Sequence, residues 1–165
     1  MRTTAHTFVF CANGPSGIGI NNWSSCSNPQ VWVLRDDGTL ISRWKPSADP
    51  TDAWVDWQQF PTPPSGKLVG ICATGLSNAF LDLRAILFGV TDDGQIFTCV
   101  GGAQVFTPWA AMDAPSGIRF KEISAAQDAG GRPYLWAIDT NSSVWFRFKP
   151  AFGQPDSAWD HWVAW

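Results

Sequence analysis

Short apolar runs bounded by turn residues recur along this chain. Three of them are TFVFCANG (7–14), LVGICATG (68–75) and, more loosely, EISAAQDAGG (122–131). Runs of this length that end in Gly, Asn or Asp predict β-strands. The segment LDLRAILFGV (81–90) is long enough for a helix turn or two, but its second half fits the strand pattern, so we expect a loop followed by a strand. The chain is therefore predicted to be all-β.

A hairpin-like segment occurs three times. Its copies are VLRDDGTLISRWKP (33–46), GVTDDGQIFTCVGG (89–102) and AIDTNSSVWFRFKP (137–150). In this alignment Gly38, Gly94 and Ser142 occupy one position, between two strand-like runs. The two Asp-Gly pairs suit a tight turn because glycine adopts a positive φ at little cost. In the third copy we expect Asn141 to adopt the positive φ.

A tryptophan-rich segment follows each hairpin. The copies are AWVDW (53–57), PWAAM (108–112) and AWDHW (158–162). Aligned as written, they place Trp54, Trp109 and Trp159 in one column and put Met112 where the other copies have a second tryptophan. We expect these three tryptophans to pack mainly between sheets, one in each repeat.

Each unit therefore contains four strands in a repeat of roughly 50 residues, a period typical of β-propeller blades. The predicted blades cover about 3–60, 61–113 and 114–165 of a single domain, 1–165. Propellers usually close with about four to eight blades, so three blades leave two apolar flanks open. A symmetric partner that completes a six-bladed ring is the simplest remedy, and we predict a homodimer.

The charge composition argues against several classes of binding partner. The formal net charge is −3 and the basic residues are scattered, so neither nucleic acid nor membrane insertion is expected. The first residues lack the apolar core of a signal peptide, which predicts a soluble protein that is cytoplasmic or non-classically secreted. The unusual feature is 11 Trp and 11 Phe against a single Tyr. Such a surplus indicates repeated architecture, ligand stacking, or both.

Catalysis is not expected. His6 and His161 occupy non-equivalent positions without a cysteine or acidic cluster at metal-ligand spacing, so no metal or other cofactor is predicted. Turn aspartates such as Asp37 and Asp93 offer a conceivable carboxylate pair for glycoside hydrolysis. Their repetition at the same turn favours turn chemistry instead.

The four cysteines show no CxxC spacing. We expect most of them to be small core residues, with a disulfide between Cys11 and Cys26 as the less favoured alternative. Their spacing leaves the pairing open.

Several aromatic and basic residues are candidates for a sugar site. A pyranose has an apolar C–H face and a rim of hydroxyls, so its receptors combine an indole face with hydrogen-bonding groups. The candidates pair such groups in the repeat or lie in a long polar loop; they are Arg43, Trp44, Trp57, Trp145, Arg147, Trp162 and Trp23. A purely structural role in the sheets is the alternative interpretation of these tryptophans.

With DDGTLISRWKP and AWVDW aligned across units, the sequence resembles the propeller lectins, both the tachylectin and tectonin type and the fucose- or GlcNAc-binding propellers of bacteria and fungi. The resemblance implies a multivalent, non-catalytic lectin with glycan sites in the clefts between blades, and ring assembly from short chains. The alternatives are a protein-interaction or toxin-associated scaffold and, as a minor one, a glycan-cleaving enzyme.

Overall fold

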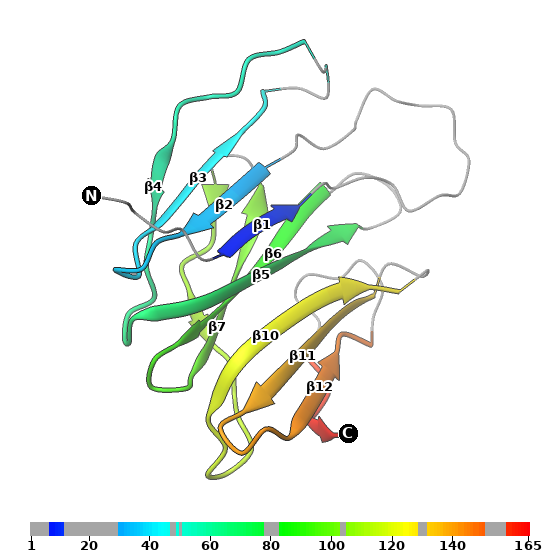
Figure 1. Cartoon of the computed structure of the whole chain (residues 1–165). Coiled ribbons are helices and arrows are strands. Elements are labelled where there is room, and N and C mark those ends of the chain that lie inside the picture. The colour runs from blue at the N-terminus through cyan, green and yellow to red at the C-terminus, as the bar shows by residue number, and fades with distance from the viewer. Residues whose placement is uncertain are drawn as a thin grey trace.

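The structure is a computed structural model of the chain (Figure 1). It describes residues 7–11, 30–46, 49, 51–77, 83–102, 105–128, 132–150 and 158–165. These ranges contain strands and turns but no helix, so the prediction of an all-β chain is confirmed.

The strands form three antiparallel sheets, each of which follows the order of the chain. The first sheet contains β1 (Thr7–Cys11), β2 (Gln30–Leu34), β3 (Leu40–Trp44) and β4 (Gln58–Phe60). The second contains β5 (Leu68–Ser77), β6 (Leu83–Thr91), β7 (Ile96–Gly102), β8 (Val105–Phe106) and β9 (Ala110–Ala111). The third contains β10 (Phe120–Gln127), β11 (Pro133–Asp139), β12 (Val144–Phe148) and β13 (Val163–Ala164).

The second sheet departs from the expected four strands. Its outer position holds two short strands, β8 and β9, which pair with different parts of β7. Elsewhere the inner, pre-turn and post-turn strands are confirmed, and within 81–90 the strand part is β6, which begins at Leu83, while residues 81–82 lie outside the described ranges. The prediction that the tryptophan runs are themselves the outer strands was wrong for 53–57 and 158–162. There the outer strands β4 and β13 begin directly after the run, at Gln58 and Val163.

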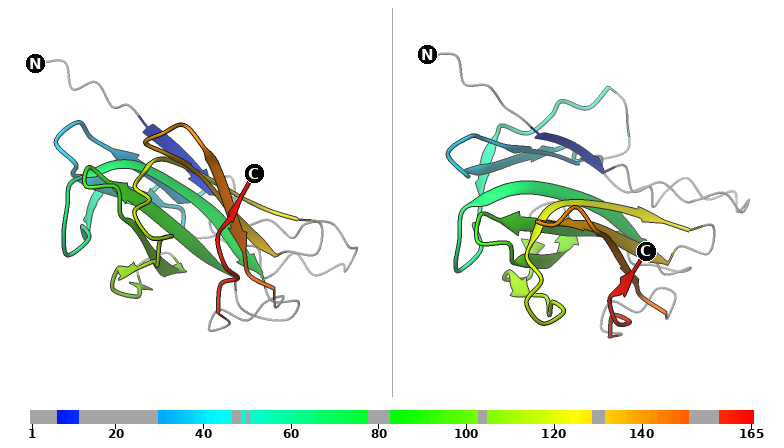
Figure 2. Two further views of the ribbon diagram at one scale, coloured as in Figure 1. Left: turned by 90° about the horizontal axis from the view of Figure 1, so that it is seen from below. Right: turned by 60° about the horizontal axis from the view of Figure 1, so that its bottom comes forward.

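The sheets pack face to face in sequence order, and the second sheet lies between the other two (Figure 2). The first strand of the second sheet, β5, contacts the first strands of both neighbouring sheets, β1 and β10. One apolar cluster fills the space between the first and second sheets, around Trp32 and Leu87. A second cluster fills the space between the second and third sheets, around Phe88 and Leu135. The three sheets do not close into a ring.

The backbone confirms that the three turn positions aligned in the sequence are equivalent. Gly38 and Gly94 both have φ of 84°, and Ser142 has φ of 66°. The prediction that Asn141 takes the positive φ was wrong. In each turn the third loop residue closes the hairpin by donating its N–H to the carbonyl three residues earlier, as Ser142 donates to Asp139. That position carries the left-handed conformation whichever residue type stands there.

Turn carboxylates hold these hairpins in shape. Asp37 accepts the N–H of Thr39 at 2.8 Å, and the buried Asp139 accepts those of Asn141 and Ser143, also at 2.8 Å. A hydrogen bond from the Trp145 indole is the main cause that lowers the pKa of Asp139. The expected turn role is thus confirmed for Asp37, and Asp139, which was not predicted, plays the same role in the third hairpin.

Two cysteines belong to the core, as expected. Cys72 and Cys99 are free thiols, one in each apolar cluster, and burial raises the pKa of both. Cys26 and the side chain of Cys11 lie outside the described residues.

Candidate functional site

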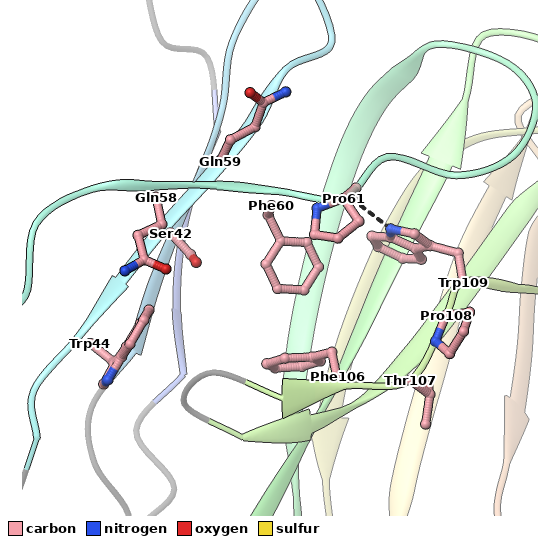
Figure 3. Close-up of a pocket in the computed structure, with 10 residues that line it drawn as sticks. All are labelled: Ser42, Trp44, Gln58, Gln59, Phe60, Pro61, Phe106, Thr107, Pro108 and Trp109. Atoms are coloured by element: carbon pink, nitrogen blue, oxygen red, sulfur yellow. Dashed lines mark hydrogen bonds between the residues drawn. The ribbon is translucent and has the colours of Figure 1, made fainter.

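A cavity of about 360 Å³ opens between the first and second sheets. We call it the first cleft; its lining is contributed by β3 and β4 on one side and by the β8–β9 segment on the other (Figure 3). The lining residues are Ser42, Trp44, Gln58, Gln59, Phe60, Pro61, Phe106, Thr107, Pro108 and Trp109. Its size is at the lower end of the range for small-molecule pockets, about 300–1,000 Å³.

Aromatic rings form much of the first cleft. Phe60 stands edge to face with Phe106, with ring centroids 5.0 Å apart, and with Trp109 at 6.2 Å. Trp109 is fixed because its indole N–H donates to the carbonyl oxygen of Pro61 at 2.7 Å. On the opposite side, Trp44 is only 4% exposed. Apolar ring faces held this rigidly suit the C–H face of a flat cyclic ligand.

Neutral polar groups complete the lining. Gln58 lies opposite Ser42 in the β3–β4 register, and both side chains face the cavity. The Thr107 hydroxyl accepts the N–H of Val100 at 3.0 Å, which leaves its own O–H available as a donor. Gln59 also borders the cavity, but Figure 3 shows its amide pointing away. The first cleft therefore offers amide and hydroxyl groups and no charged side chain among its lining residues.

The junction between the second and third sheets is built around a buried arginine. Arg147 is 3% exposed, and its Nη1 lies 2.6 Å from Oδ1 of Asp113. Its guanidinium carbon lies 5.8 Å from the ring centroid of Trp159 and 5.2 Å from that of Trp162. We call Arg147, Trp159 and Trp162 the Arg147 cluster.

The second sheet orders this cluster from the other side. The hydrogen bond from Arg147 is the main cause that lowers the pKa of Asp113. The main-chain oxygen of Asp113 accepts the Trp162 indole N–H at 2.8 Å. Trp159 packs on Phe88 with ring centroids 5.6 Å apart. An ion pair and two indoles thus occupy the position that the first cleft leaves hollow.

A third group of the same kind lies on the first sheet. The guanidinium carbon of Arg43 lies 5.0 Å from the ring centroid of Trp54 and 4.7 Å from that of Trp57. We call these residues the Arg43 cluster. Arg43 lies opposite Val31 in the β2–β3 register, whereas Trp44 and Ser42 share the other face with Trp32. The cluster therefore lies on the face of the first sheet that points away from the second sheet.

The pairing of the outer strands corrects the predicted tryptophan column. The hairpins make Leu40, Ile96 and Val144 equivalent, and each is paired with one residue of the outer segment. The three paired residues are Phe60, Met112 and Trp165. Counting back three residues makes Trp57, Trp109 and Trp162 equivalent. Trp109 therefore does not match Trp54 and Trp159, and Met112 does not replace a tryptophan of the W-x-x-W pair.

The predicted candidates are thus distributed over several places. Trp44 lines the first cleft, Arg147 and Trp162 belong to the Arg147 cluster, and Arg43 and Trp57 belong to the Arg43 cluster. The indole N–H of Trp145 donates to Oδ2 of Asp139 at 3.0 Å, which ties it to a hairpin turn. Trp23 lies outside the described residues.

Sequence reasoning missed several residues of these sites. Phe60, Phe106 and Gln58 line the first cleft, and Asp113 pairs with Arg147. Asp113 directly follows the residue equivalent to Phe60, at a position where the first unit has Pro61. If the outer segments had been aligned by their strand pairing, Asp113 would have been placed beside the tryptophan segment of the third unit.

Within the described ranges, no group of three or more His, Cys, Asp or Glu side chains is arranged to hold a metal ion. The same ranges contain no helix long and apolar enough to cross a membrane.

Comparison with known proteins identifies similar folds among lectins. No protein-family model matches the chain, and no curated protein matches its sequence. The lectin BP39L from Burkholderia pseudomallei superposes with a TM-score of 0.62 and 16% identity, over 95% of this chain and 40% of that chain. A triple arginine-to-alanine variant of AofleA from Arthrobotrys oligospora gives 0.61 and 12%, over 95% and 42%.

A third likeness is to a fucose lectin from Kordia zhangzhouensis in complex with methyl-fucoside, with a TM-score of 0.49, 12% identity and coverage of 84% and 92%. The first two matches confirm the resemblance inferred from the repeat at the level of the fold. This chain spans about 40% of the length of those two lectin chains.

Proposed function

We propose that the chain is a non-catalytic lectin that binds a neutral sugar in the first cleft. The observation that carries this proposal is a cavity of about 360 Å³ lined by aromatic rings together with amide and hydroxyl groups. Indole and phenyl faces match the C–H face of a pyranose, and Gln58, Ser42 and Thr107 match its hydroxyl rim. The fold shared with two lectins supports the same ligand class. Fucose and GlcNAc are the sugars to test first.

Binding tests with a matched pair of variants check this site. Gln58 and Gln59 are adjacent, exposed and on the same strand, but only the amide of Gln58 faces the cavity (Figure 3). On a glycan array and in titration calorimetry, Gln58→Ala should weaken sugar binding about tenfold, the effect of losing one or two hydrogen bonds. Gln59→Ala should bind as the unchanged protein does.

Trp44→Ala should also weaken binding, provided that circular dichroism shows an intact fold. Equal affinities for the two glutamine variants would place the sugar elsewhere. No binding to any glycan at high protein density would favour the protein-interaction scaffold. Turnover of a fluorogenic glycoside would favour an enzyme.

We further propose that the three sheets are blades and that two chains close a six-bladed ring. The support is the face of the third sheet that looks away from the second. Its members occupy positions whose counterparts in the other sheets are largely buried; they are Trp136, Ile138, Val144, Phe146, Phe148 and Trp165. Trp165 is 85% exposed, whereas its equivalents Phe60 and Met112 are each 7% exposed. We call this face the third-sheet flank.

The first sheet carries a complementary face. The Arg43 cluster lies at the positions that the Arg147 cluster uses to dock on the second sheet. One chain thus carries both halves of an interface that it already makes between its own sheets. A second copy is therefore the natural occupant of each end.

Mass measurement tests the ring. Size-exclusion chromatography with light scattering should give a dimer at micromolar concentration, and Trp165→Lys should shift it to monomer because a second cation would replace a ring and face the Arg43 cluster. Val105→Lys is the matched control, since Val105 is 78% exposed on the second sheet. Deletion of residues 163–165 should act as Trp165→Lys does. A stable wild-type monomer would overturn the ring while leaving the lectin site open to its own test.

A further inference from the structure

The Arg43 and Arg147 clusters have the same construction. In each, a guanidinium lies over two indoles that are three positions apart in the sequence, with two residues between them. In each, a lysine two residues after the arginine approaches the first indole: Lys45 at 5.9 Å from Trp54, and Lys149 at 5.6 Å from Trp159. The repeat has therefore produced one binding arrangement twice, on the first and third sheets.

The two arginines differ in what neutralises them. Arg147 is paired with Asp113, which the preceding sheet supplies, and the same residue accepts the Trp162 indole N–H. Arg43 has no hydrogen-bond or ion-pair partner among the described residues, although the buried Nε is without a partner in both arginines. The Arg43 guanidinium therefore keeps N–H donors that no described residue uses.

The residues that would face Arg43 in a closed ring are aromatic. Ser42 and Trp44 form the first-sheet wall of the first cleft, and the hairpin alignment makes Phe146 and Phe148 their equivalents in the third sheet. Trp165 is the equivalent of Phe60 and stacks edge to face on Phe146 at 5.9 Å. The third-sheet flank therefore supplies ring faces, but none of its six members carries a carboxylate for Arg43.

From these observations we infer that the Arg43 cluster is half of a site for a carboxylate-bearing sugar, completed by the third-sheet flank of a second copy. The inference rests on the proposed dimeric lectin. The guanidinium binds the sugar carboxylate through two parallel N–H···O bonds, and the aromatic flank covers the C–H face of the ring. The seam thus selects an acidic sugar, whereas the first cleft within each chain takes a neutral one.

Charge-specific variants test the ligand class. On an array carrying uronic-acid, sialylated, sulfated and neutral glycans, Arg43→Gln should lose about 10- to 100-fold in affinity for the carboxylated glycans. It should keep the neutral binding that depends on Gln58. Arg35→Gln removes the same charge from an exposed hairpin turn and should change neither. Carboxylate binding should also weaken as salt rises.

Complementation tests the composite nature of the site. Arg43→Gln and Trp165→Ala should each lose carboxylate binding alone. Mixed and re-equilibrated, they should recover about a quarter of the wild-type sites, because half of the dimers are mixed and each has one intact seam. No recovery, or carboxylate binding by a wild-type monomer, would overturn the composite site.

The remaining outcomes separate this inference from the proposed function. Unchanged carboxylate binding by Arg43→Gln overturns the inference alone, as does stronger binding to sulfated than to carboxylated glycans. If a group of the second copy itself satisfies Arg43, Arg43→Gln weakens the dimer and carboxylated glycans do not bind the unchanged protein, which overturns the inference. If Arg43→Gln misfolds, Arg43→Lys keeps the charge and should retain part of the salt-sensitive binding; its complete loss counts against the inference. If the unchanged protein binds no neutral sugar, that result contradicts the proposed function rather than this inference.

Discussion

The two sheet–sheet junctions of this chain use one scaffold to make opposite environments. In both, an indole N–H donates to a main-chain carbonyl of the preceding sheet, from Trp109 to Pro61 at 2.7 Å and from Trp162 to Asp113 at 2.8 Å. In the first junction the equivalent of Arg147 is Cys99, which is buried in the apolar cluster. The result is a hollow, uncharged cleft beside a closed, charged junction.

The difference shows which positions decide the character of a junction. The two junctions differ at several equivalent positions, among them Cys99 against Arg147, Phe106 against Trp159, and Pro61 against Asp113. The long arginine fills the space between the two rings, and the aspartate neutralises it. Without them, the same backbone leaves a cavity of about 360 Å³.

Converting the open junction into the closed one should have the largest effect. Cys99→Arg brings an unpaired charge into a largely buried position and should lower the free energy of unfolding by about 3–5 kcal/mol. Adding Pro61→Asp supplies the missing carboxylate and should restore about 1–2 kcal/mol of that loss. Urea denaturation followed by tryptophan fluorescence measures both.

The double variant should also lose sugar binding, because its arginine occupies the first cleft. Cys99→Ser is the control for removing the thiol without adding charge. If Pro61→Asp is equally stabilising in the Cys99→Arg and unchanged backgrounds, the two positions are not coupled as proposed.

Opening the closed junction should have the next largest effect. Arg147→Ala removes a buried side chain that packs between two indoles, and it should cost about 2–3 kcal/mol of unfolding free energy. Arg43→Ala is the matched control, since Arg43 makes the same ring contacts but is partly exposed and unpaired with a carboxylate. It should cost less than about 1 kcal/mol in the monomer. Equal losses would mean that the Asp113 pair and the burial of Arg147 add nothing.

A smaller effect is expected from the two indole hydrogen bonds. Trp109→Phe and Trp162→Phe keep the ring and remove the N–H, so each should cost about 1 kcal/mol in chemical denaturation. Their effects on sugar affinity should differ, because only Trp109 lines the first cleft. A comparable loss of neutral-sugar affinity in Trp162→Phe would move the site to the second junction.

Much of the fold was predictable from local pattern. The hairpin copies at 33–46, 89–102 and 137–150 contain alternating strands around a turn, and their alignment holds at every pair of the register. The tryptophan segments were not predictable in the same way. W-x-x-W repeats itself every three residues, so a shift of three places one tryptophan on another. Only the partner strand decides the register, through contacts such as Leu40 with Phe60.

The candidate site was predicted less completely for a related reason. Arginine followed by an aromatic residue marked Arg43 and Arg147, but the sequence does not state which sheet face each occupies. Neighbouring residues of one strand point to opposite faces, so Trp44 lines the first cleft whereas Arg43 lies on the face that points away from the second sheet. At the junction that holds the first cleft, the position equivalent to Arg147 is Cys99, which is buried in the apolar cluster. A missing side chain gives no motif to search for.

The smallest expected effect is the pH dependence of the closed junction. The hydrogen bond from Arg147 holds the pKa of Asp113 below its ordinary value. A carboxyl with a depressed folded-state pKa contributes stability above its unfolded pKa, near 4, and this contribution is lost as the pH falls through the lower folded value. Asp113→Asn should therefore be less stable than the unchanged protein by about 0.5 kcal/mol at pH 7, since the carboxylate is largely exposed. The difference should shrink below pH 4 in urea denaturation series. A constant difference down to pH 2 would mean that the charge of Asp113 does not stabilise Arg147.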